Sequence, residues 1–206
     1  MNVIYLHGFQ SSANSIKGQL LRDFCRGFPD TEVHLPDLNA PPQQVMDQMS
    51  RLIETLDDVA LVGSSLGGFY ATQLVAKYHV PAVLINPAVR PWQLFRDLFS
   101  ETALPYVVTD SWTLDDAQLT EMQHLAVCHI AHTERLLVLL QQGDETLDYL
   151  HAQQFYSAEQ AGCAMVMTEI GGNHGMDNFA EKIPMLLQFL ADAVKNKRAQ
   201  EKRISV

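Results

Sequence analysis

The sequence predicts an α/β fold in three layers, with helices on both faces of a mostly parallel six-stranded sheet. Short apolar runs alternate with longer segments whose apolar residues recur every three or four positions, which is the pattern of β-α-β units. Most of the short runs are apolar throughout, as expected of parallel strands buried on both faces. A length of 206 residues fits a single domain, residues 1–206.

Six short runs are the predicted strands. They cover residues 3–7, 32–36, 59–64, 82–86, 135–141 and 164–170. Because a crossover between parallel strands is almost always right-handed, the chain is expected to wind in one sense and to place helices on both faces.

Four segments between and after these strands have helical periodicity. The first two are expected to cover a sheet face with Ile16, Leu20, Leu21, Phe24 and Phe28, and with Val45, Met49, Leu52, Ile53 and Leu56. The third spans residues 66–79. The last carries Ile183, Leu186, Leu187, Leu190 and Val194.

One connection is longer than a single crossover helix needs. More than forty residues separate the fourth and fifth predicted strands, and we interpret about 88–133 as a helical cap inserted into the domain. Two sets of apolar residues at helical spacing predict two or three helices there: Trp92, Phe95 and Phe99, and then Leu119, Met122 and Ala126.

Charge and cysteine content narrow the class of partner and the compartment. Fourteen basic and 24 acidic residues leave a net charge of −10, which disfavours nucleic acid or an anionic membrane as a partner. Cys25, Cys128 and Cys163 lie far apart without CxxC spacing, so no disulfide framework is indicated. No apolar run approaches the roughly 18 residues needed to cross a bilayer, and no signal peptide is recognisable. We therefore expect a soluble, cytoplasmic protein.

The strongest chemical motif is Gly63-Ser64-Ser65-Leu66-Gly67, a GxSxG sequence between a predicted strand and a predicted helix. A nucleophile elbow needs such a turn, with small residues two positions before and after the serine. Centring the motif on Ser64 would put Val62 and Leu66 at those positions. Ser65 is therefore the candidate nucleophile, the alternative being a Gly/Ser-rich turn that only caps the helix.

A serine hydroxyl needs a base and a group that orients the base. Asp144 follows the fifth strand and His174 follows the sixth, at the edge where open parallel sheets build their sites. The chain order of serine, acid and histidine is that of the α/β-hydrolase fold. Competing carboxylates are Glu145 and Asp148, and competing histidines are His7, His132 and His151.

His7-Gly8-Phe9-Gln10 follows the first strand, next to the predicted nucleophile strand. A His-Gly turn at this place commonly presents a backbone N–H to an oxyanion. The amides of Phe9 and Leu66 are the two candidate donors. The alternative is a turn in which glycine only supplies a special backbone angle.

No cofactor or metal is indicated. His124, His129 and His132 have no matching carboxylate or cysteine pattern, and neither a Walker motif nor GxGxxG is present.

Together, HGF after the first strand, GSSLGG after the third, QQGDE and GGNHG resemble the small bacterial YqiA-like esterases of the α/β-hydrolase superfamily. The resemblance covers nearly the whole chain. It implies a minimal α/β-hydrolase with strand order 2-1-3-4-5-6 that acts as a serine esterase or thioesterase on acyl substrates. It also assigns Ser65 as nucleophile, His174 as general base and acid, and Asp144 as the orienting carboxylate, with Phe9 and Leu66 supplying the oxyanion amides.

The substrate is less well defined. Trp92 and Phe95 in the cap are candidates for the wall of an acyl pocket, against the alternative of ordinary core packing, and Arg90 and Arg96 are candidates for a cationic rim. A serine peptidase or a C–C bond hydrolase would use the same triad, and a non-catalytic binding protein could have the same fold. The oligomeric state is left open.

Overall fold

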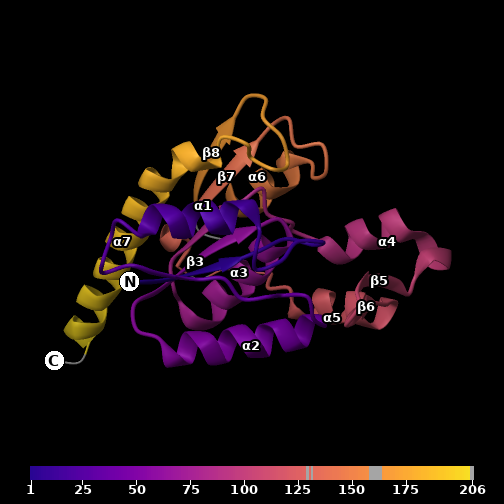
Figure 1. The fold of residues 1–206 in the computed structure, drawn as a ribbon, viewed down its shortest axis with the longest axis horizontal. Coiled ribbons are helices and arrows are strands. Elements are labelled where there is room, and N and C mark those ends of the chain that lie inside the picture. Colours follow the sequence, from indigo (N-terminus) through magenta and orange to yellow (C-terminus); the bar gives the residue numbers. More distant parts are fainter. Residues whose placement is uncertain (129, 131, 158–163, 205–206) are drawn as a thin grey trace.

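The computed structural model describes residues 1–128, 130, 132–157 and 164–204, and Figure 1 shows its fold. Within these residues, six strands form one parallel sheet in the order β2-β1-β3-β4-β7-β8. The strands are β1 (Asn2–Leu6), β2 (Glu32–His34), β3 (Val59–Ser64), β4 (Ala82–Ile85), β7 (Leu136–Gln141) and β8 (Met165–Glu169). Every run predicted as a strand forms one, with ends that differ by at most two residues. The order confirms the predicted 2-1-3-4-5-6 arrangement.

The strands alternate their side chains between two apolar cores, one on each face of the sheet. On β1, Val3 and Tyr5 belong to one core, and Ile4 and Leu6 to the other. The first core is closed by α1 (Ile16–Cys25) and α7 (Phe179–Ile204), and the second by α2 (Pro42–Thr55), α3 (Leu66–Tyr78) and α6 (Tyr149–Ser157). The predicted three-layer class is confirmed.

The prediction for the buried face of α1 is wrong in part. Leu21 is buried as expected, but Ile16, Leu20, Phe24 and Phe28 are 80%, 38%, 38% and 49% exposed. The buried face is instead made by Gly18, Leu21 and Cys25, three and four residues apart. A Cβ atom on Gly18 would lie 3.1 Å from the Tyr5 ring, so the absence of a side chain at Gly18 lets this face of the helix lie close to the sheet.

The two outer strands also differ from fully buried runs. On β8, Met165 and Met167 point to one face and are 57% and 39% exposed, whereas Val166 packs against the core on the other face. β8 is the last strand of the sheet, and the face that carries the two methionines is incompletely covered, so these side chains stay accessible to solvent.

The segment between β4 and β7 contains strands as well as the predicted helices. It forms α4 (Pro91–Ala103), β5 (Tyr106–Thr109), β6 (Trp112–Leu114) and α5 (Asp116–Leu125), grouped on the right in Figure 1. The antiparallel β5-β6 pair was not predicted, although two short runs rich in aromatic and β-branched residues flank Asp110 and Ser111. In the described residues, no helix combines the length and the hydropathy needed to cross a bilayer.

Candidate active site

Ser65 lies in the sharp turn between β3 and α3, with a left-handed backbone (φ 55°, ψ −119°). A Cβ atom on Gly63 would lie 2.5 Å from the Gly67 carbonyl oxygen, and one on Gly67 would lie 2.0 Å from that of Leu6. Both distances are too short for a side chain, so the turn needs glycine two residues before and after Ser65. A tight strand-to-helix turn of this kind is what a nucleophile elbow requires.

The two adjacent serines have different surroundings. Ser64 is 4% exposed and lies beside buried Tyr5, whose pKa is raised to about 12 chiefly by burial. Ser65 is half-buried. The backbone of Ser65 is fixed on both sides, since its N–H donates to the Ile85 carbonyl at 3.0 Å and its carbonyl accepts from the Ala88 N–H at 3.1 Å.

Asp144 and His174 form a close pair at the carboxyl ends of β7 and β8. His174 Nδ1 lies 2.8 Å from Asp144 Oδ2 and 3.0 Å from Oδ1. The carboxylate is only 2% exposed, and Oδ1 accepts from the backbone N–H groups of Thr146 and Leu147 at 2.9 and 2.8 Å. These donors compensate for the burial of a charge, and an ionised Asp144 then holds the proton of the imidazole on Nδ1.

Glu145 contributes to the site in a way that the sequence did not predict. Its carboxylate accepts the backbone N–H of His174 at 3.0 Å, and this hydrogen bond is the main reason that the pKa of Glu145 is lowered. Asp148, the other competing carboxylate, accepts the N–H of Leu150 at the start of α6. Asp144 is therefore the acid that reaches the imidazole.

The amides of Phe9 and Leu66 are placed near Ser65. A Cβ atom on Gly8 would lie 3.1 Å from Ser65 Cβ and 3.6 Å from Ser65 Oγ, so the His7-Gly8-Phe9 loop lies against the candidate nucleophile. Over the part of the chain that the structure describes, neither the Phe9 nor the Leu66 N–H donates a hydrogen bond. Two unused amides beside a serine are what an oxyanion site requires.

The His7 side chain is buried (2% exposed), and its hydrogen bonds fix the His7-Gly8-Phe9 loop. Its Nε2 accepts the Leu38 N–H at 2.9 Å, and its Nδ1 lies 2.9 Å from the Gly8 carbonyl. Since an N–H can donate only to an unprotonated nitrogen, this pattern belongs to a neutral ring protonated on Nδ1. The 3.4 Å approach of Asp37 to Nε2 is then no ion pair.

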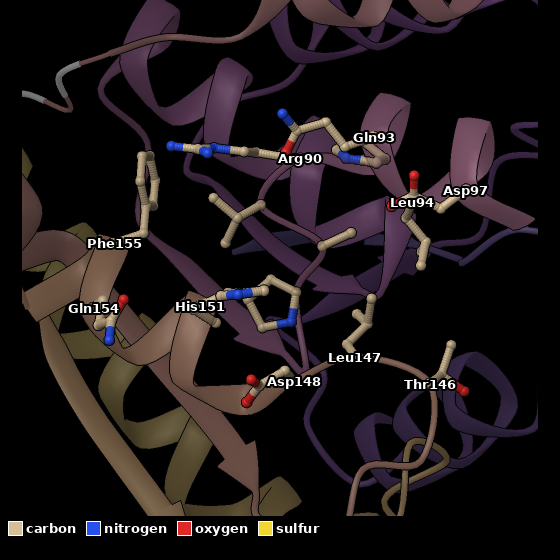
Figure 2. A pocket seen from close by; sticks show the side chains of 15 residues that line it. Arg90, Gln93, Leu94, Asp97, Thr146, Leu147, Asp148, His151, Gln154 and Phe155 are labelled. Atoms are coloured by element: carbon tan, nitrogen blue, oxygen red, sulfur yellow. The ribbon is translucent and has the colours of Figure 1, made fainter.

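A hollow of about 510 Å³ opens between α4 and α6 (Figure 2). Arg90, Gln93, Leu94 and Asp97 line it from the cap side, and Thr146, Leu147, Asp148, His151, Gln154 and Phe155 line it from the opposite side. It begins close to the catalytic candidates. Ala88, in its wall, hydrogen bonds to Ser65, and Leu147 hydrogen bonds to Asp144.

Trp92 and Phe95 occupy different positions in the cap. Trp92 is 9% exposed and lines an adjoining hollow of about 570 Å³, which shares Arg90 and Phe155 with the first. Phe95 is 3% exposed, and its ring centroid lies 4.6 Å from that of Phe9. Phe95 therefore packs on the loop that carries the Phe9 amide.

The two candidate rim arginines also differ. Arg90 lines both hollows, whereas Arg96 is bound to Asp116 at 3.0 Å and to Thr120 at 3.1 Å. Within the described ranges, no three His, Cys, Asp or Glu side chains are grouped to hold a metal ion. His129 and Cys163 lie outside the described residues.

Comparison with known proteins gives a family and a fold. A model of the group described as "Uncharacterised protein family (UPF0227)" matches residues 2–191. Est1E from Butyrivibrio proteoclasticus, in a structure with ferulic acid bound, is 14% identical with a TM-score of 0.70, over 94% of this chain and 89% of Est1E. Mouse alpha/beta hydrolase domain-containing protein 10 is 16% identical with a TM-score of 0.69, over 93% and 89% of the two chains.

A variant of the meta-cleavage product hydrolase CumD is also similar, with 14% identity and a TM-score of 0.64 over 93% of this chain and 91% of CumD. At these identities the similarity establishes the fold. It is the α/β-hydrolase fold, and the resemblance that the sequence motifs indicated is confirmed.

Proposed function

This chain belongs to the uncharacterised protein family UPF0227, and from the geometry of its own residues we propose that it is a serine hydrolase that cleaves carboxylic ester or thioester bonds of acyl substrates. The observation that carries the proposal is the buried Asp144 carboxylate 2.8 Å from His174 Nδ1, at the sheet edge where the strained Ser65 elbow also lies. Est1E, which has ferulic acid bound in its structure, has the same fold, and a small carboxylic acid as its ligand agrees with this assignment.

The proposed reaction has two steps. Ser65 Oγ attacks the acyl carbonyl carbon while His174 takes the hydroxyl proton, and His174 then gives that proton to the leaving alcohol or thiol. Water, deprotonated by His174, then attacks the acyl carbon. The bond to Ser65 Oγ breaks, His174 returns the proton to Oγ, and the carboxylic acid is released. Asp144 stays ionised and keeps the imidazole in the tautomer whose Nε2 can accept a proton.

The negative charge on the carbonyl oxygen in each transition state needs hydrogen-bond donors. The Phe9 and Leu66 amides, which lie beside Ser65 without partners in the described part of the chain, are the proposed donors. Because these donors belong to the backbone, side-chain substitution at either position leaves the N–H groups in place.

The hollow between α4 and α6 is the proposed acyl pocket. The adjoining hollow, which Trp92 lines, is proposed to extend this pocket. Leu94, Leu147 and Phe155 give it apolar walls, which suits an acyl chain or an aromatic acyl group. Phe95 is proposed to support this site through Phe9. The proposed partner is thus a small acyl ester or thioester, for which no cofactor is needed.

The test is covalent labelling with a fluorophosphonate followed by intact-mass spectrometry, together with turnover of p-nitrophenyl and thioester acyl substrates. One adduct that maps to Ser65, and turnover that Ser65→Ala lowers by about 10⁴-fold or more, are expected. Folded protein that forms no adduct would contradict the proposal and favour a binding protein with this fold.

Turnover of peptide amides and of substrates with a cleavable C–C bond, measured beside the esters, separates the alternatives that share a triad. A serine peptidase or a C–C bond hydrolase would also form the Ser65 adduct. Such an enzyme would prefer a peptide amide, or a substrate with a cleavable C–C bond next to a carbonyl, over the acyl esters. A higher kcat/KM for either of these than for every ester and thioester would replace the proposed substrate class.

A further inference from the structure

Asn86 immediately follows β4 and is almost completely buried, at 2% exposed. Its backbone is left-handed, with φ 40°, a conformation in which asparagine, aspartate and glycine are favoured over other residues. Its N–H donates to the Leu139 carbonyl at 2.9 Å, which continues the pairing of β4 with β7. From the sequence, this residue is expected only as the last residue of a strand.

The side chain of Asn86 is bound through both of its polar atoms. Nδ2 donates to the carbonyl oxygens of Asn173 and His174 at 3.1 and 3.2 Å, and Oδ1 accepts the Gln141 N–H at 3.0 Å. Carbonyls only accept and an amide N–H only donates, so these partners fix which end of the side chain is oxygen. Asn86 therefore binds the backbone on both sides of the His174 side chain.

Gln141 closes a ring with Asn86. It is 3% exposed, and its Oε1 accepts the Asn173 N–H at 2.9 Å. Its own N–H is the one bound by Asn86, and Asn86 also binds the Asn173 carbonyl. Two buried side-chain amides thus fix the peptide groups that lead into His174.

The chain around Asn86 also holds the nucleophile. The Ile85 carbonyl accepts the Ser65 N–H, and the Ala88 N–H donates to the Ser65 carbonyl. Residues 85–88 therefore hold Ser65 through backbone groups and His174 through the side chain of Asn86. Since the imidazole must reach Ser65 Oγ, the separation of these two anchors matters for catalysis.

We propose that Asn86 is a positioning residue that sets the placement of His174 relative to Ser65. The inference rests on the proposed function, and it assigns no contact with substrate to Asn86. Its two donor hydrogens hold the His174 loop against β4, while Asp144 and Glu145 hold the imidazole and the backbone N–H of the same residue.

Two variants preserve the left-handed backbone and remove the interaction in different ways. Asn86→Asp keeps the size and the acceptor for Gln141, but it directs a carboxylate oxygen at two carbonyl oxygens. Asn86→Gly deletes the side chain at a φ that glycine adopts without strain. Val194→Ala, in a residue of α7 that is 7% exposed, is the matched control for a loss of stability elsewhere.

The measurements are the rate of fluorophosphonate labelling, kcat and KM on a p-nitrophenyl ester, and the proton NMR signal of His174 Nδ1–H, with folding checked by circular dichroism. We expect both Asn86 variants to lower the labelling rate and kcat by about 30- to 300-fold, with KM within about threefold, because a misplaced catalytic group costs rate rather than binding. The Nδ1–H signal should weaken or shift. Val194→Ala should lower Tm and leave the other readouts unchanged.

Labelling and kcat within threefold of wild type in both folded variants would overturn the role of Asn86. An equal loss in Val194→Ala would also overturn it, since instability alone would then explain the effect. Wild-type protein that neither labels nor turns over contradicts the proposed function instead. In that case the Nδ1–H signal decides: if it is unchanged in both variants the role is rejected, and if it is lost the positioning of His174 by Asn86 is supported.

Discussion

The Glu145 carboxylate accepts the backbone N–H of His174 at 3.0 Å, while the preceding residue, Asp144, binds the imidazole of the same histidine. Two consecutive acidic residues thus fix different parts of one residue. Asp144 is buried and orients the ring, whereas Glu145 lies at the surface and orients the main chain. The QQGDE sequence therefore supplies both contacts from a single loop.

Removing the Glu145 contact should loosen His174 without removing the triad. Glu145→Ala is expected to lower kcat on a p-nitrophenyl ester by about 3- to 10-fold, because it frees the His174 N–H. Glu145→Gln keeps an acceptor oxygen and should stay within about twofold of wild type. Equal losses in the two variants would contradict a role for the hydrogen bond.

The lowered pKa of Glu145 predicts a pH dependence. Because the folded pKa lies below the ordinary value of 4.5, the contact stabilises the folded state above that value and is lost as pH falls through the folded pKa. Thermal unfolding followed as pH is lowered from neutral should show a smaller loss of Tm in Glu145→Gln than in wild type. The same loss in both proteins would exclude this linkage.

Ser65, the proposed nucleophile, has a strained backbone. A non-glycine residue at φ 55° and ψ −119° costs on the order of 1–3 kcal/mol, so Ser65→Gly should raise the free energy of unfolding by about 1 kcal/mol after the extra entropy of glycine in the unfolded chain is subtracted. Turnover should be abolished. Urea unfolding measures the first effect, and Ser64→Gly, at a residue that has no positive φ, should destabilise the protein.

Gly8 lies where a side chain would crowd the nucleophile. Gly8→Ala would place Cβ 3.1 Å from Ser65 Cβ and 3.3 Å from the Ser64 carbonyl oxygen, so the loop that carries the Phe9 amide must shift. We expect kcat/KM to fall about 10-fold and stability to fall by about 1–3 kcal/mol. Gly27→Ala, where the nearest atom would be 3.8 Å away, should change both values little. Unchanged turnover in Gly8→Ala would place the oxyanion site elsewhere.

Much of the fold could be predicted because it depends on patterns close together in the sequence. Parallel strands buried on both faces are recognisable as apolar runs. The glycine spacing around Ser65 is recognisable because a Cβ atom at Gly67 or Gly63 would lie only 2.0 or 2.5 Å from a carbonyl oxygen. Because Asp144 and His174 follow successive predicted strands, the sequence predicts that both lie at one sheet edge.

What could not be predicted depends on contacts between distant residues. In the sequence, Asn86 and Gln141 are simply polar residues at the ends of predicted strands. Only the tertiary structure brings them to the backbone of Asn173 and His174. The buried face of α1 was predicted wrongly because Gly18, which has no apolar side chain to reveal its burial, lies close to the sheet. The β5-β6 pair was missed because each strand is short and lies within a segment whose helical periodicity dominated.

Glu169 is connected to the backbone next to His174 through Gln141. Its carboxylate accepts a hydrogen bond from the Gln141 side chain, whose oxygen accepts the Asn173 N–H. Hydrogen bonds from Lys182, Gln141 and Asn178 lower its pKa to about 2, with Lys182 the largest cause. The stabilisation is therefore present above pH 4.5 and lost as pH falls toward 2. Since this network is partly exposed, we expect a contribution of only about 1 kcal/mol after solvent screening. Urea unfolding of wild type and Glu169→Gln at several pH values in that window should show that the variant loses less free energy of unfolding as the pH falls. Equal losses in the two proteins would contradict this contribution of Glu169.

The cap residues Trp92 and Phe95 should affect different kinetic quantities. Trp92 lines the hollow next to the proposed acyl pocket and packs edge-on against Phe69, with ring centroids 6.2 Å apart. Trp92→Ala should enlarge this space and shift the preferred acyl length upward in a series of p-nitrophenyl esters. Phe95 packs on Phe9 at 4.6 Å, within an aromatic cluster that also contains Phe99. Phe95→Ala should therefore lower kcat for every chain length by about 10-fold, through the loop that carries the Phe9 amide.

Phe99→Leu is the matched control, because Phe99 contacts Phe9 at the longer centroid distance of 6.2 Å and leucine retains most of the apolar packing. It should change the length profile and kcat little. A profile that stays the same in Trp92→Ala would mean that Trp92 only packs the cap, and the acyl chain would then be bound entirely between α4 and α6. A change of length preference in Phe95→Ala without a general loss of kcat would instead place Phe95 directly against the substrate.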